Sequence, residues 1–245
     1  MGWEALKHWG ADAVRIEKLT GGVANDVWSV SVNGRLAVGR LGRRSEADVG
    51  WEAALLVHLS QHGMTVPMPV PTTDGRLFFD GLMVMDYVEG KPPETDGDWA
   101  RVAETLRQLH GLTRDWPQRP GWRGSLDLLQ QDSGTRIDLA AMPPEGVARC
   151  RAAWARLAGR PTSVVHGDPN PRNIRITNDR VALIDWDEAH VDVSALDLDL
   201  PGNVAGFDAT EQDIVQQASA AWEAAVCWKD DYAEKRLAEV RPVVA

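Results

Sequence analysis

Two short polar clusters contain the residues whose types and spacing are suited to chemistry. In the first cluster, Asp168 follows His166 and precedes Asn173 by five positions. The second cluster begins at Asp185, directly after a short apolar run. Transfer of a phosphoryl group requires a positioned nucleophile and ligands for the metal ions that bridge the phosphates. Because Mg²⁺ prefers carboxylate and amide oxygens, the two clusters indicate phosphoryl transfer.

Strands must position both clusters, since each one follows a short apolar run of β type. Val164 and Val165 precede the first cluster, and the run 181–184 precedes the second. A loop that leaves the first strand can direct Asp168 at an acceptor hydroxyl and Asn173 at a metal ion. The aspartate at the end of the second strand would complete the metal site.

The motif His166-Gly167-Asp168 with Asn173, followed twelve residues later by Asp185, resembles the signature of the aminoglycoside phosphotransferase and choline-kinase-like family. That family is distantly similar in fold to protein kinases. The resemblance implies a small-molecule kinase in which Asp168 orients or deprotonates the acceptor hydroxyl. It also implies that Asn173 and Asp185 bind Mg²⁺, and that His166 braces the loop.

The second cluster differs from its protein-kinase counterpart. Asp185-Trp186-Asp187 has no glycine where protein kinases have Asp-Phe-Gly. This difference argues against a mobile activation segment and a protein substrate. It also makes Asp187 a further candidate for binding Mg²⁺.

A candidate phosphate-binding cation lies earlier in the chain. The run 37–40 stands where kinases have Val-Ala-Ile-Lys, whose cation pairs with the nucleotide phosphates and with a helix glutamate. Here the cation is Arg40, and the expected partner is Glu52, in a predicted helix. Glu46 is a second choice because it lies near the start of that helix. A rigid guanidinium fork is not equivalent to a compact ammonium group, so the exchange changes how phosphates are held.

Two further segments fit a nucleotide, ATP or GTP. A loop of small residues before the first long strand, with Gly21, Gly22 and Asn25, would let backbone N–H groups approach phosphate oxygens. Further on, a segment that resembles the interlobe hinge of kinases would read the base edge. There the carbonyl of Asp86 and the N–H of Val88 would contact the edge of the base.

The first third of the chain shows patterns of strands and turns around one helix. Asn33-Gly34 and Asp80-Gly81 are hairpin signals, the second between the runs 76–79 and 82–88. Between the two hairpins, 46–62 has apolar residues at helical spacing. A small antiparallel sheet with one helix is therefore expected.

After residue 88 the pattern becomes mainly helical. The expected helices cover 99–112, 146–157, 211–228 and 231–240. Together with the resemblance, this change predicts an α+β, two-lobed protein-kinase-like fold. The N-terminal nucleotide-binding lobe would cover 1–88, and the C-terminal catalytic and acceptor-binding lobe would cover 89–245.

Composition and charge exclude several classes of protein. The formal net charge of −10 argues against nucleic-acid binding, which requires clustered positive charge. Cys150 and Cys227 are far apart and outside any metal-ligand spacing, so neither a disulfide framework nor a zinc site is expected. No run is long and apolar enough to span a membrane, and no leader pattern is evident, so we expect a cytoplasmic protein.

The negative charge is concentrated in one region. Between Arg180 and Lys229 there are ten acidic residues and no lysine or arginine. Clustered carboxylates focus negative potential, so we expect a cationic acceptor such as an aminoglycoside or a basic peptide antibiotic. The candidates for binding it are Asp192, Asp199, Asp208 and Glu211. Asp197, in a Leu-Asp-Leu setting that the resembling family shares, is instead a candidate for a structural hydrogen-bonding role.

Two alternatives remain open at this level. A metabolic kinase for choline, homoserine or a sugar-like acceptor would use the same catalytic motif. A pseudokinase that binds nucleotide without turnover is suggested by Arg40, although the retention of Asp168, Asn173 and Asp185 favours an active enzyme. The acceptor and its hydroxyl, the choice between ATP and GTP, and the oligomeric state are left open.

Overall fold

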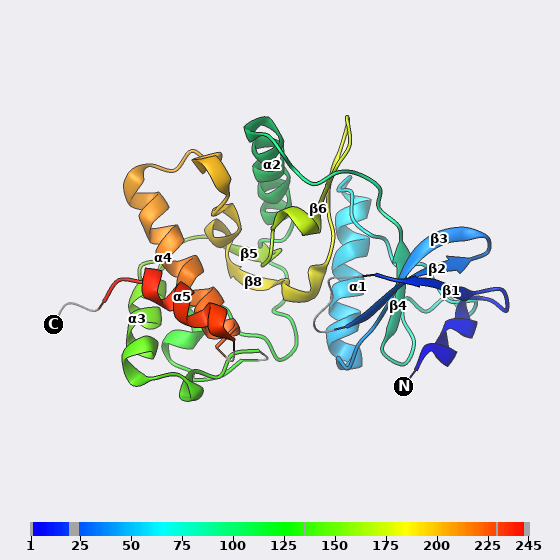
Figure 1. Cartoon of the computed structure of the whole chain (residues 1–245), viewed down its shortest axis with the longest axis horizontal. Coiled ribbons are helices and arrows are strands. Elements are labelled where there is room, and N and C mark those ends of the chain that lie inside the picture. The colour runs from blue at the N-terminus through cyan, green and yellow to red at the C-terminus, as the bar shows by residue number, and fades with distance from the viewer. Residues whose placement is uncertain (1, 20–24, 135, 229, 243–245) are drawn as a thin grey trace. The chain divides into compact units, whose positions relative to one another are not determined.

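The computed structural model describes residues 2–19, 25–134, 136–228 and 230–242 of the 245-residue chain. The chain splits into two compact units (Figure 1). One is formed by Met1–Pro92 with Pro171–Ile184, and the other by Pro93–Asn170 with Asp185–Ala245. The first unit thus includes residues 171–184, a segment that the division at residue 88 assigns to the second lobe.

The first unit is built on a four-stranded antiparallel sheet in the order β1-β2-β3-β4. Its strands are β1 (Val14–Lys18), β2 (Asp26–Val32), β3 (Arg35–Leu41) and β4 (Leu82–Asp86). The helices are a 3₁₀ helix η1 (Trp3–Trp9) and the α-helix α1 (Glu46–Gln61), and a separate hairpin pairs β6 (Ile174–Ile176) with β7 (Val181–Leu183). The predicted small antiparallel sheet with one α-helix is confirmed.

The β2–β3 hairpin follows the turn chemistry of its sequence. Asn33 and Gly34 both have positive φ, 51° and 74°, and Val32 pairs directly with Arg35. Positive φ at both central residues is what a two-residue type I′ turn requires, and Asn-Gly supplies it at low cost.

The second predicted hairpin is only partly correct. A single bridge joins Phe79 to Leu82, and the run 76–79 forms no strand. The reason is a local turn, in which the Arg76 N–H donates to Thr72 Oγ1 at 2.9 Å and the Arg76 carbonyl accepts from the Thr72 N–H at 2.7 Å. These bonds occupy backbone groups that a strand would have used.

The two faces of the sheet have different partners. Val30 pairs with Ala37, and both belong to an apolar cluster with Ala5, Leu6 and Trp9 of η1. Since side chains alternate along a strand, Arg40, three positions after Ala37, lies on the opposite face. The packing of η1 therefore leaves the face that carries Arg40 for other contacts.

The second unit is mainly helical, as predicted. Its α-helices are α2 (Asp96–Leu112), α3 (Pro144–Ala155), α4 (Ala209–Val226) and α5 (Asp231–Glu239). An antiparallel pair of strands, β5 (Thr162–Val165) and β8 (His190–Val193), carries the loops described below. The short 3₁₀ helices are η2 (Asp127–Leu129), η3 (Leu139–Ala141), η5 (Trp186–Glu188), η6 (Ser194–Leu198) and η7 (Pro201–Asn203), with η4 (Pro171–Asn173) in the first unit.

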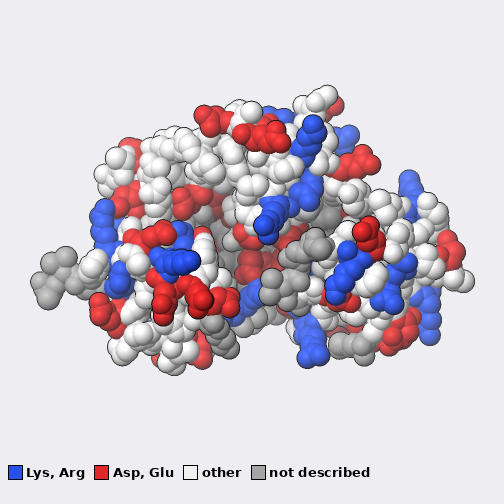
Figure 2. All heavy atoms as spheres, viewed as in Figure 1, with Lys and Arg blue, Asp and Glu red and all other residues white. Residues whose placement is uncertain are grey.

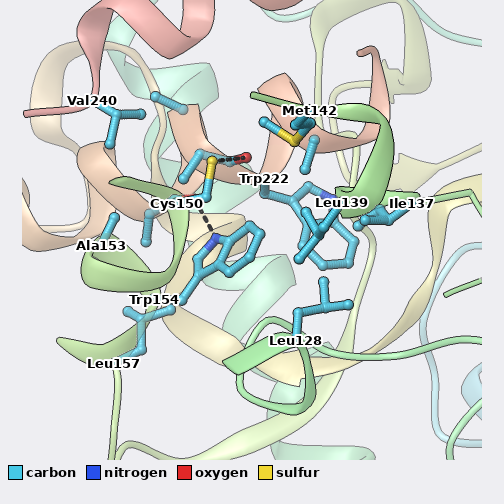
Figure 3. Packing of buried hydrophobic residues seen from close by; sticks show 14 of the residues in the cluster. Leu128, Ile137, Leu139, Met142, Cys150, Ala153, Trp154, Leu157, Trp222 and Val240 are labelled. Carbon is cyan, nitrogen blue, oxygen red and sulfur yellow. Dashed lines mark hydrogen bonds between the residues drawn. The ribbon is translucent and has the colours of Figure 1, made fainter. Parts of the chain in front are cut away.

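The core of the second unit lies between α3 and α4 (Figure 3). Trp154 is fully buried there, and its Nε1–H donates to the Ala218 carbonyl at 3.3 Å. Burying a large apolar side chain stabilises a fold by about 1.5–3 kcal/mol, so this cluster anchors the two helices. Cys150 is also buried, and burial raises the pKa of its thiol to about 12.

Cys150 and Cys227 are both free thiols, and Cys227 is only half-buried. Within the ranges described, no helix has both the length and the apolar character needed to span a bilayer.

Candidate active site

The loop that follows β5 is anchored by a buried carboxylate from later in the chain. Asp197 accepts hydrogen bonds from the backbone N–H groups of His166, at 2.7 Å, and Gly167, at 3.0 Å. His110 Nε2 contacts the same carboxylate at 3.0 Å. Asp197 therefore fixes the path of the backbone immediately before Asp168, which is the structural role considered for it from the sequence.

Asp197 is 2% exposed, and its environment favours the ionised form. Burial raises the pKa of the carboxyl, but the hydrogen bond from His110 and the charges of His110 and His166 outweigh it, and the pKa is lowered overall. Hydrogen bonds to a charged group are the stronger kind, so this brace is worth more than an ordinary loop contact.

Gly167 is required by its conformation and by its surroundings. Its φ is +83°, a region that side chains other than glycine rarely adopt. A Cβ at this position would also lie 2.4 Å from the carbonyl oxygen of Glu188. The glycine of the motif therefore allows the strand end to pack against the backbone of a second loop.

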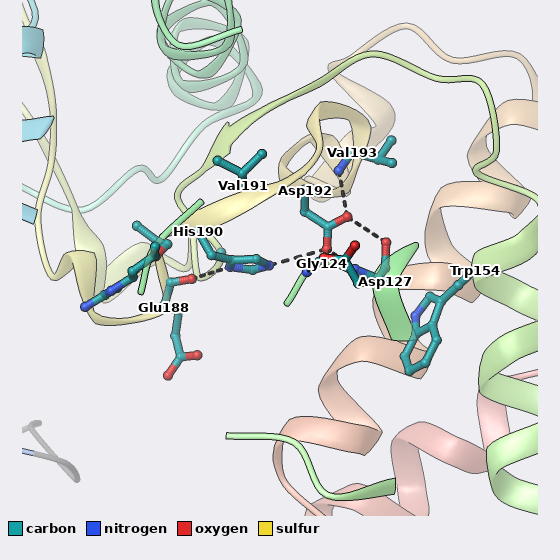
Figure 4. Close-up of polar contacts among 12 residues, drawn as sticks. Gly124, Asp127, Trp154, Glu188, His190, Val191, Asp192 and Val193 are labelled. Carbon is teal, nitrogen blue, oxygen red and sulfur yellow. Dashed lines mark hydrogen bonds and ion pairs between the residues drawn. The ribbon is translucent and has the colours of Figure 1, made fainter. Parts of the chain in front are cut away.

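A buried polar cluster fixes that Glu188 carbonyl (Figure 4). His190 Nδ1 contacts the carbonyl oxygen at 2.7 Å, and Nε2 lies 3.3 Å from Asp192 Oδ2. The imidazole ring stacks against Trp122 and Trp222, with centroid distances of 5.1 and 4.6 Å. The residues behind Gly167 are thus held by both packing and hydrogen bonding.

Asp168 lies at the end of this loop, partly exposed, with its carboxylate oriented by a neighbour. The Asn170 side-chain amide donates to Asp168 Oδ1 at 2.8 Å, and the Asn170 N–H donates to the Asp168 carbonyl at 2.8 Å. The Asp168 N–H lies 3.4 Å from His166 Nδ1, which agrees with the expected bracing role of His166. Asn170 was not predicted from the sequence to orient the aspartate, although its position two residues after Asp168 was a usable signal.

The loop that begins at Asp185 is held by a buried arginine, Arg119. This role of Arg119 was not predicted from the sequence. Arg119 is 1% exposed, and its Nη1 donates to the carbonyls of Trp186, Asp187 and Ala189 at 3.1, 2.9 and 2.8 Å. Just before them, exposed Asp185 has a left-handed backbone with φ 61° and ψ 74°. Such a conformation in a residue other than glycine is uncommon and is found where surrounding structure enforces it.

Asn173 belongs to the first unit, where it ends η4 and is 7% exposed. Its carbonyl accepts a hydrogen bond from the Ile184 N–H at 2.9 Å, so it starts the β6–β7 hairpin that leads directly to Asp185. With Asp187, these residues offer two carboxylates and one amide, oxygen donors that fit a hard ion such as Mg²⁺. Across the described ranges no three His, Cys, Asp or Glu side chains group as metal ligands.

The expected ion pair between strand and helix is confirmed in the first unit. Arg40 Nη2 on β3 contacts Glu52 Oε1 on α1, and both side chains are buried. Glu46, the second choice, is exposed at the first turn of α1. Arg44 also contacts Glu52, through Oε2, a partner that the strand motif did not predict.

The two segments predicted to bind the nucleotide both belong to the first unit. Gly21 and Gly22 lie outside the described residues. Asn25 is half-buried, and its side-chain oxygen would lie 2.1 Å from a Cβ at Gly42, so the two positions pack closely. Asp86 ends β4, and its N–H donates to the Met68 carbonyl at 2.8 Å.

The segment after β4 passes through half-buried Val88 and is then fixed again. Lys91 and Ile176 exchange backbone hydrogen bonds of 3.0 and 2.7 Å. The stretch with the Asp86 carbonyl and the Val88 N–H is therefore anchored at both ends, by β4 and by the β6–β7 hairpin.

Some acidic residues of the region between Arg180 and Lys229 pair with arginines from elsewhere in the chain. Glu188 pairs with Arg136, Glu211 with Arg160, and Asp213 lies 3.0 Å from Arg156. Figure 2 shows basic and acidic side chains side by side at its left, where the second unit lies. The charge of these carboxylates is therefore partly balanced by neighbouring arginines.

The prediction that Asp192 binds an acceptor is wrong. Asp192 is 3% exposed, and its carboxylate accepts from the Ser125 N–H at 2.7 Å, from Ser125 Oγ at 2.6 Å and from the Val193 N–H at 2.7 Å. Such a carboxylate braces β8 and offers no surface to a ligand.

Of the other three acidic candidates, Asp208 and Glu211 have structural partners. Asp208 caps α4, accepting from the Glu211 N–H at 2.8 Å, and Glu211 pairs with Arg160. Asp199 is half-buried, and burial raises the pKa of its carboxyl despite the nearby charge of Arg236. Asp208 and Glu211 therefore have roles within the second unit besides the one predicted from the sequence.

Residues 15–237 match the sequence model of the phosphotransferase enzyme family, APH. The chain belongs to this family. A homoserine kinase of Rhodopseudomonas palustris is 27% identical over 197 residues, which are 73% of this chain and 59% of that protein. The match to a Deinococcus radiodurans protein covers 53% of the relative, so this APH chain spans little more than half the length of the curated relatives it matches.

Solved structures show that this APH chain has the protein-kinase-like fold. A microcompartment-associated aminopropanol kinase aligns with a TM-score of 0.65 at 18% identity, covering 97% of this chain and 92% of that one. The aminoglycoside phosphotransferase APH(4)-Ia gives 0.65 at 15% identity, covering 93% and 92%. At these identities the likeness concerns the fold alone, and it confirms the fold class expected from the sequence.

Proposed function

We propose that this chain transfers the γ-phosphoryl group of ATP or GTP to a hydroxyl group of a small molecule. The observation that carries the proposal is the construction of the Asp168 loop. A carboxylate that is oriented by Asn170, preceded by a glycine with no room for a side chain and anchored by buried Asp197 is held more firmly than a surface loop requires. Phosphoryl transfer requires the protein to hold the groups that position the acceptor hydroxyl in fixed places.

Asp168 would act on the acceptor. Its carboxylate accepts the proton of the hydroxyl as the hydroxyl oxygen forms a bond to the γ-phosphorus. The bond between that phosphorus and the β–γ bridging oxygen breaks, and the nucleoside diphosphate leaves. A positioned base contributes about 10²–10⁴-fold to such a step.

The first unit would bind the nucleotide. Arg40 would contact the phosphates, Gly21, Gly22 and Asn25 would cover them, and the backbone at Asp86 and Val88 would meet the base. A structural neighbour, the amicoumacin kinase hAmiN, was solved in complex with AMP-PNP and has a TM-score of 0.58 at 15% identity. This likeness supports a nucleotide as the co-substrate.

Asn173, Asp185 and Asp187 would hold Mg²⁺. Bound there, the ion would neutralise charge on the phosphates. The left-handed backbone of Asp185 and the three carbonyl contacts of Arg119 would keep the two carboxylates in place.

The acceptor is proposed to carry an amine as well as a hydroxyl. Homoserine, aminopropanol, choline and the aminoglycosides, which occur in the names of the relatives and neighbours, are all hydroxyl compounds with a cationic nitrogen. The net charge of −10 would attract such a cation even though some carboxylates of the acidic region are paired with arginines. An antibiotic and a metabolic amino alcohol both satisfy this description.

A panel of acceptors tests the proposal. ADP or GDP release in a coupled assay, with the product identified by ³¹P NMR, would be measured for amino alcohols, aminoglycosides, neutral sugars and hydroxy acids. We expect turnover with an amine-bearing alcohol, dependent on Mg²⁺. Nucleotide binding without turnover on any acceptor would instead indicate a non-catalytic protein. A neutral or anionic compound as the best substrate would contradict the proposed acceptor class.

A further inference from the structure

Two arginines share the buried carboxylate of Glu52 in the first unit. Arg40 on β3 contacts Oε1, and Arg44, from the segment between β3 and α1, contacts Oε2. The Glu52 side chain is fully buried, and the side chains of Arg40 and Arg44 are 6% and 18% exposed. Burying an unpaired carboxylate costs free energy. Both arginines therefore compensate for the buried negative charge of Glu52.

The position of Arg44 is fixed by the start of α1. It precedes Ser45, whose hydroxyl caps the helix by accepting from the Asp48 N–H at 3.2 Å. Asp48 Oδ1 lies 3.7 Å from Arg44 Nη1, and Asp48 is 6% exposed. Arg44 is therefore held between two acidic side chains of one helix face, four residues apart.

We propose that Arg44 is a positioning residue for Arg40, and this inference rests on the proposed function. A guanidinium group and a carboxylate commonly pair through two parallel bonds, one to each oxygen. Here Arg44 contacts Oε2 while Arg40 Nη2 contacts Oε1, and the contact from Arg44 holds the carboxylate plane against which the planar fork of Arg40 is oriented. A compact ammonium needs no such orientation, whereas an arginine that binds phosphates does.

The positive charge of Arg44 also helps Arg40 to bind the nucleotide phosphates. When Arg40 shares its charge with the nucleotide phosphates, Arg44 keeps the Glu52 carboxylate paired. Without Arg44, Glu52 would compete with the phosphates for Arg40. Arg40 stands where kinases usually have lysine, and Arg44 is a second cation that contacts the same glutamate.

Binding of ATP and of adenosine, measured by isothermal titration, tests this role. Arg44→Ala should raise the Kd for ATP about tenfold, the size of one charge-assisted hydrogen bond, and leave the Kd for adenosine unchanged. Arg44→Lys, which keeps the charge and loses the fork, should recover part of the loss. Arg43→Ala is the matched control, because Arg43 is exposed in the same segment, and it should bind ATP as the wild type does.

A double-mutant cycle separates positioning from direct contact. In a Glu52→Gln background, Arg44→Ala should weaken ATP binding much less than it does alone, because Arg44 acts through the Glu52 carboxylate. An equal loss in both backgrounds would place Arg44 on the phosphates and overturn the positioning role. Equal losses for ATP and adenosine would also overturn it, because they would indicate a general effect on the fold.

The remaining outcomes are also decisive. If Arg44→Ala does not fold, Arg44→Lys carries the same comparison, and an unchanged Kd for ATP in that variant overturns the inference. Failure of the wild type to bind either ATP or GTP would overturn the proposed function together with this role. Normal ATP binding by the wild type and by both Arg44 variants would overturn this role alone.

Discussion

The carboxylate of Asp197 accepts a hydrogen bond from the backbone N–H of Gly167 at 3.0 Å, thirty residues earlier in the chain. The bond joins the residue before Asp168 to a fully enclosed side chain. The conformation of the proposed catalytic loop therefore depends on the packing of η6 and α2, which contribute Asp197 and His110.

Asp197→Asn should destabilise the protein by about 3–5 kcal/mol at neutral pH, the cost of breaking a buried charged network. The pKa of Asp197 is lowered on folding, so its ionised form stabilises the fold above the ordinary carboxyl pKa of 3.8. That contribution is lost as the pH falls through the folded-state pKa. Urea unfolding of both proteins between pH 7 and pH 3 should show the difference in unfolding free energy shrinking in acid. A constant difference would contradict this assignment.

Asp168→Asn should lower turnover by about 10²–10⁴-fold, because the amide cannot accept the proton of the acceptor hydroxyl. The Kd for ATP should stay close to that of the wild type, since the carboxylate acts on the acceptor. Steady-state kinetics and isothermal titration measure the two effects separately. Turnover near the wild-type rate would remove Asp168 from the proposed role.

Gly167→Ala should cost more stability than an equivalent change elsewhere and should abolish activity. The new Cβ would meet the Glu188 carbonyl as well as adopting an unfavourable φ. Gly159→Ala is the matched control, with φ +78° and no atom within 4 Å of the added Cβ. The control should lose only about 1–2 kcal/mol from backbone strain and keep its turnover. Equal losses in thermal unfolding would show that the close approach to Glu188 is unimportant.

Asp208→Ala should lower stability by about 0.5–2 kcal/mol, because it removes the N-terminal cap of α4. The KM for the acceptor should not change. Asp230→Ala provides the comparison, since Asp230 stands at the start of α5 without a side-chain capping bond and should have a smaller effect. An increase in acceptor KM for Asp208→Ala, at unchanged stability, would return Asp208 to the acceptor site.

Several features of the site were predictable because they depend on near neighbours in the sequence. The Asn33-Gly34 turn follows from the φ values that these two residues tolerate. The pairing of Arg40 with Glu52 follows from a strand and a helix joined by a short connection. The position of Asp168 after β5 follows from an apolar run that ends in a polar motif.

Asn170 was missed although it lies only two residues after Asp168, but other features that were missed depend on partners distant in the sequence. Asp192 was assigned to an acceptor because its interval contains no lysine or arginine, yet Ser125 binds its carboxylate from 67 residues away. Glu211 in the same interval pairs with Arg160. A count of charges along the chain gives no information about which of them meet after folding.

The sequence by itself determined the family, the protein-kinase-like fold and the identity of the groups suited to phosphoryl transfer, because local patterns and a spaced motif are sufficient for these. Only the tertiary structure decided which carboxylates are braces and which remain partly exposed. Asp192 and Asp197 are buried and hydrogen-bonded, whereas Asp168 stays partly exposed beside Asn170. The physical reason is that a carboxylate enters the interior only where donors from other segments compensate for its lost hydration, and folding alone brings those donors to it.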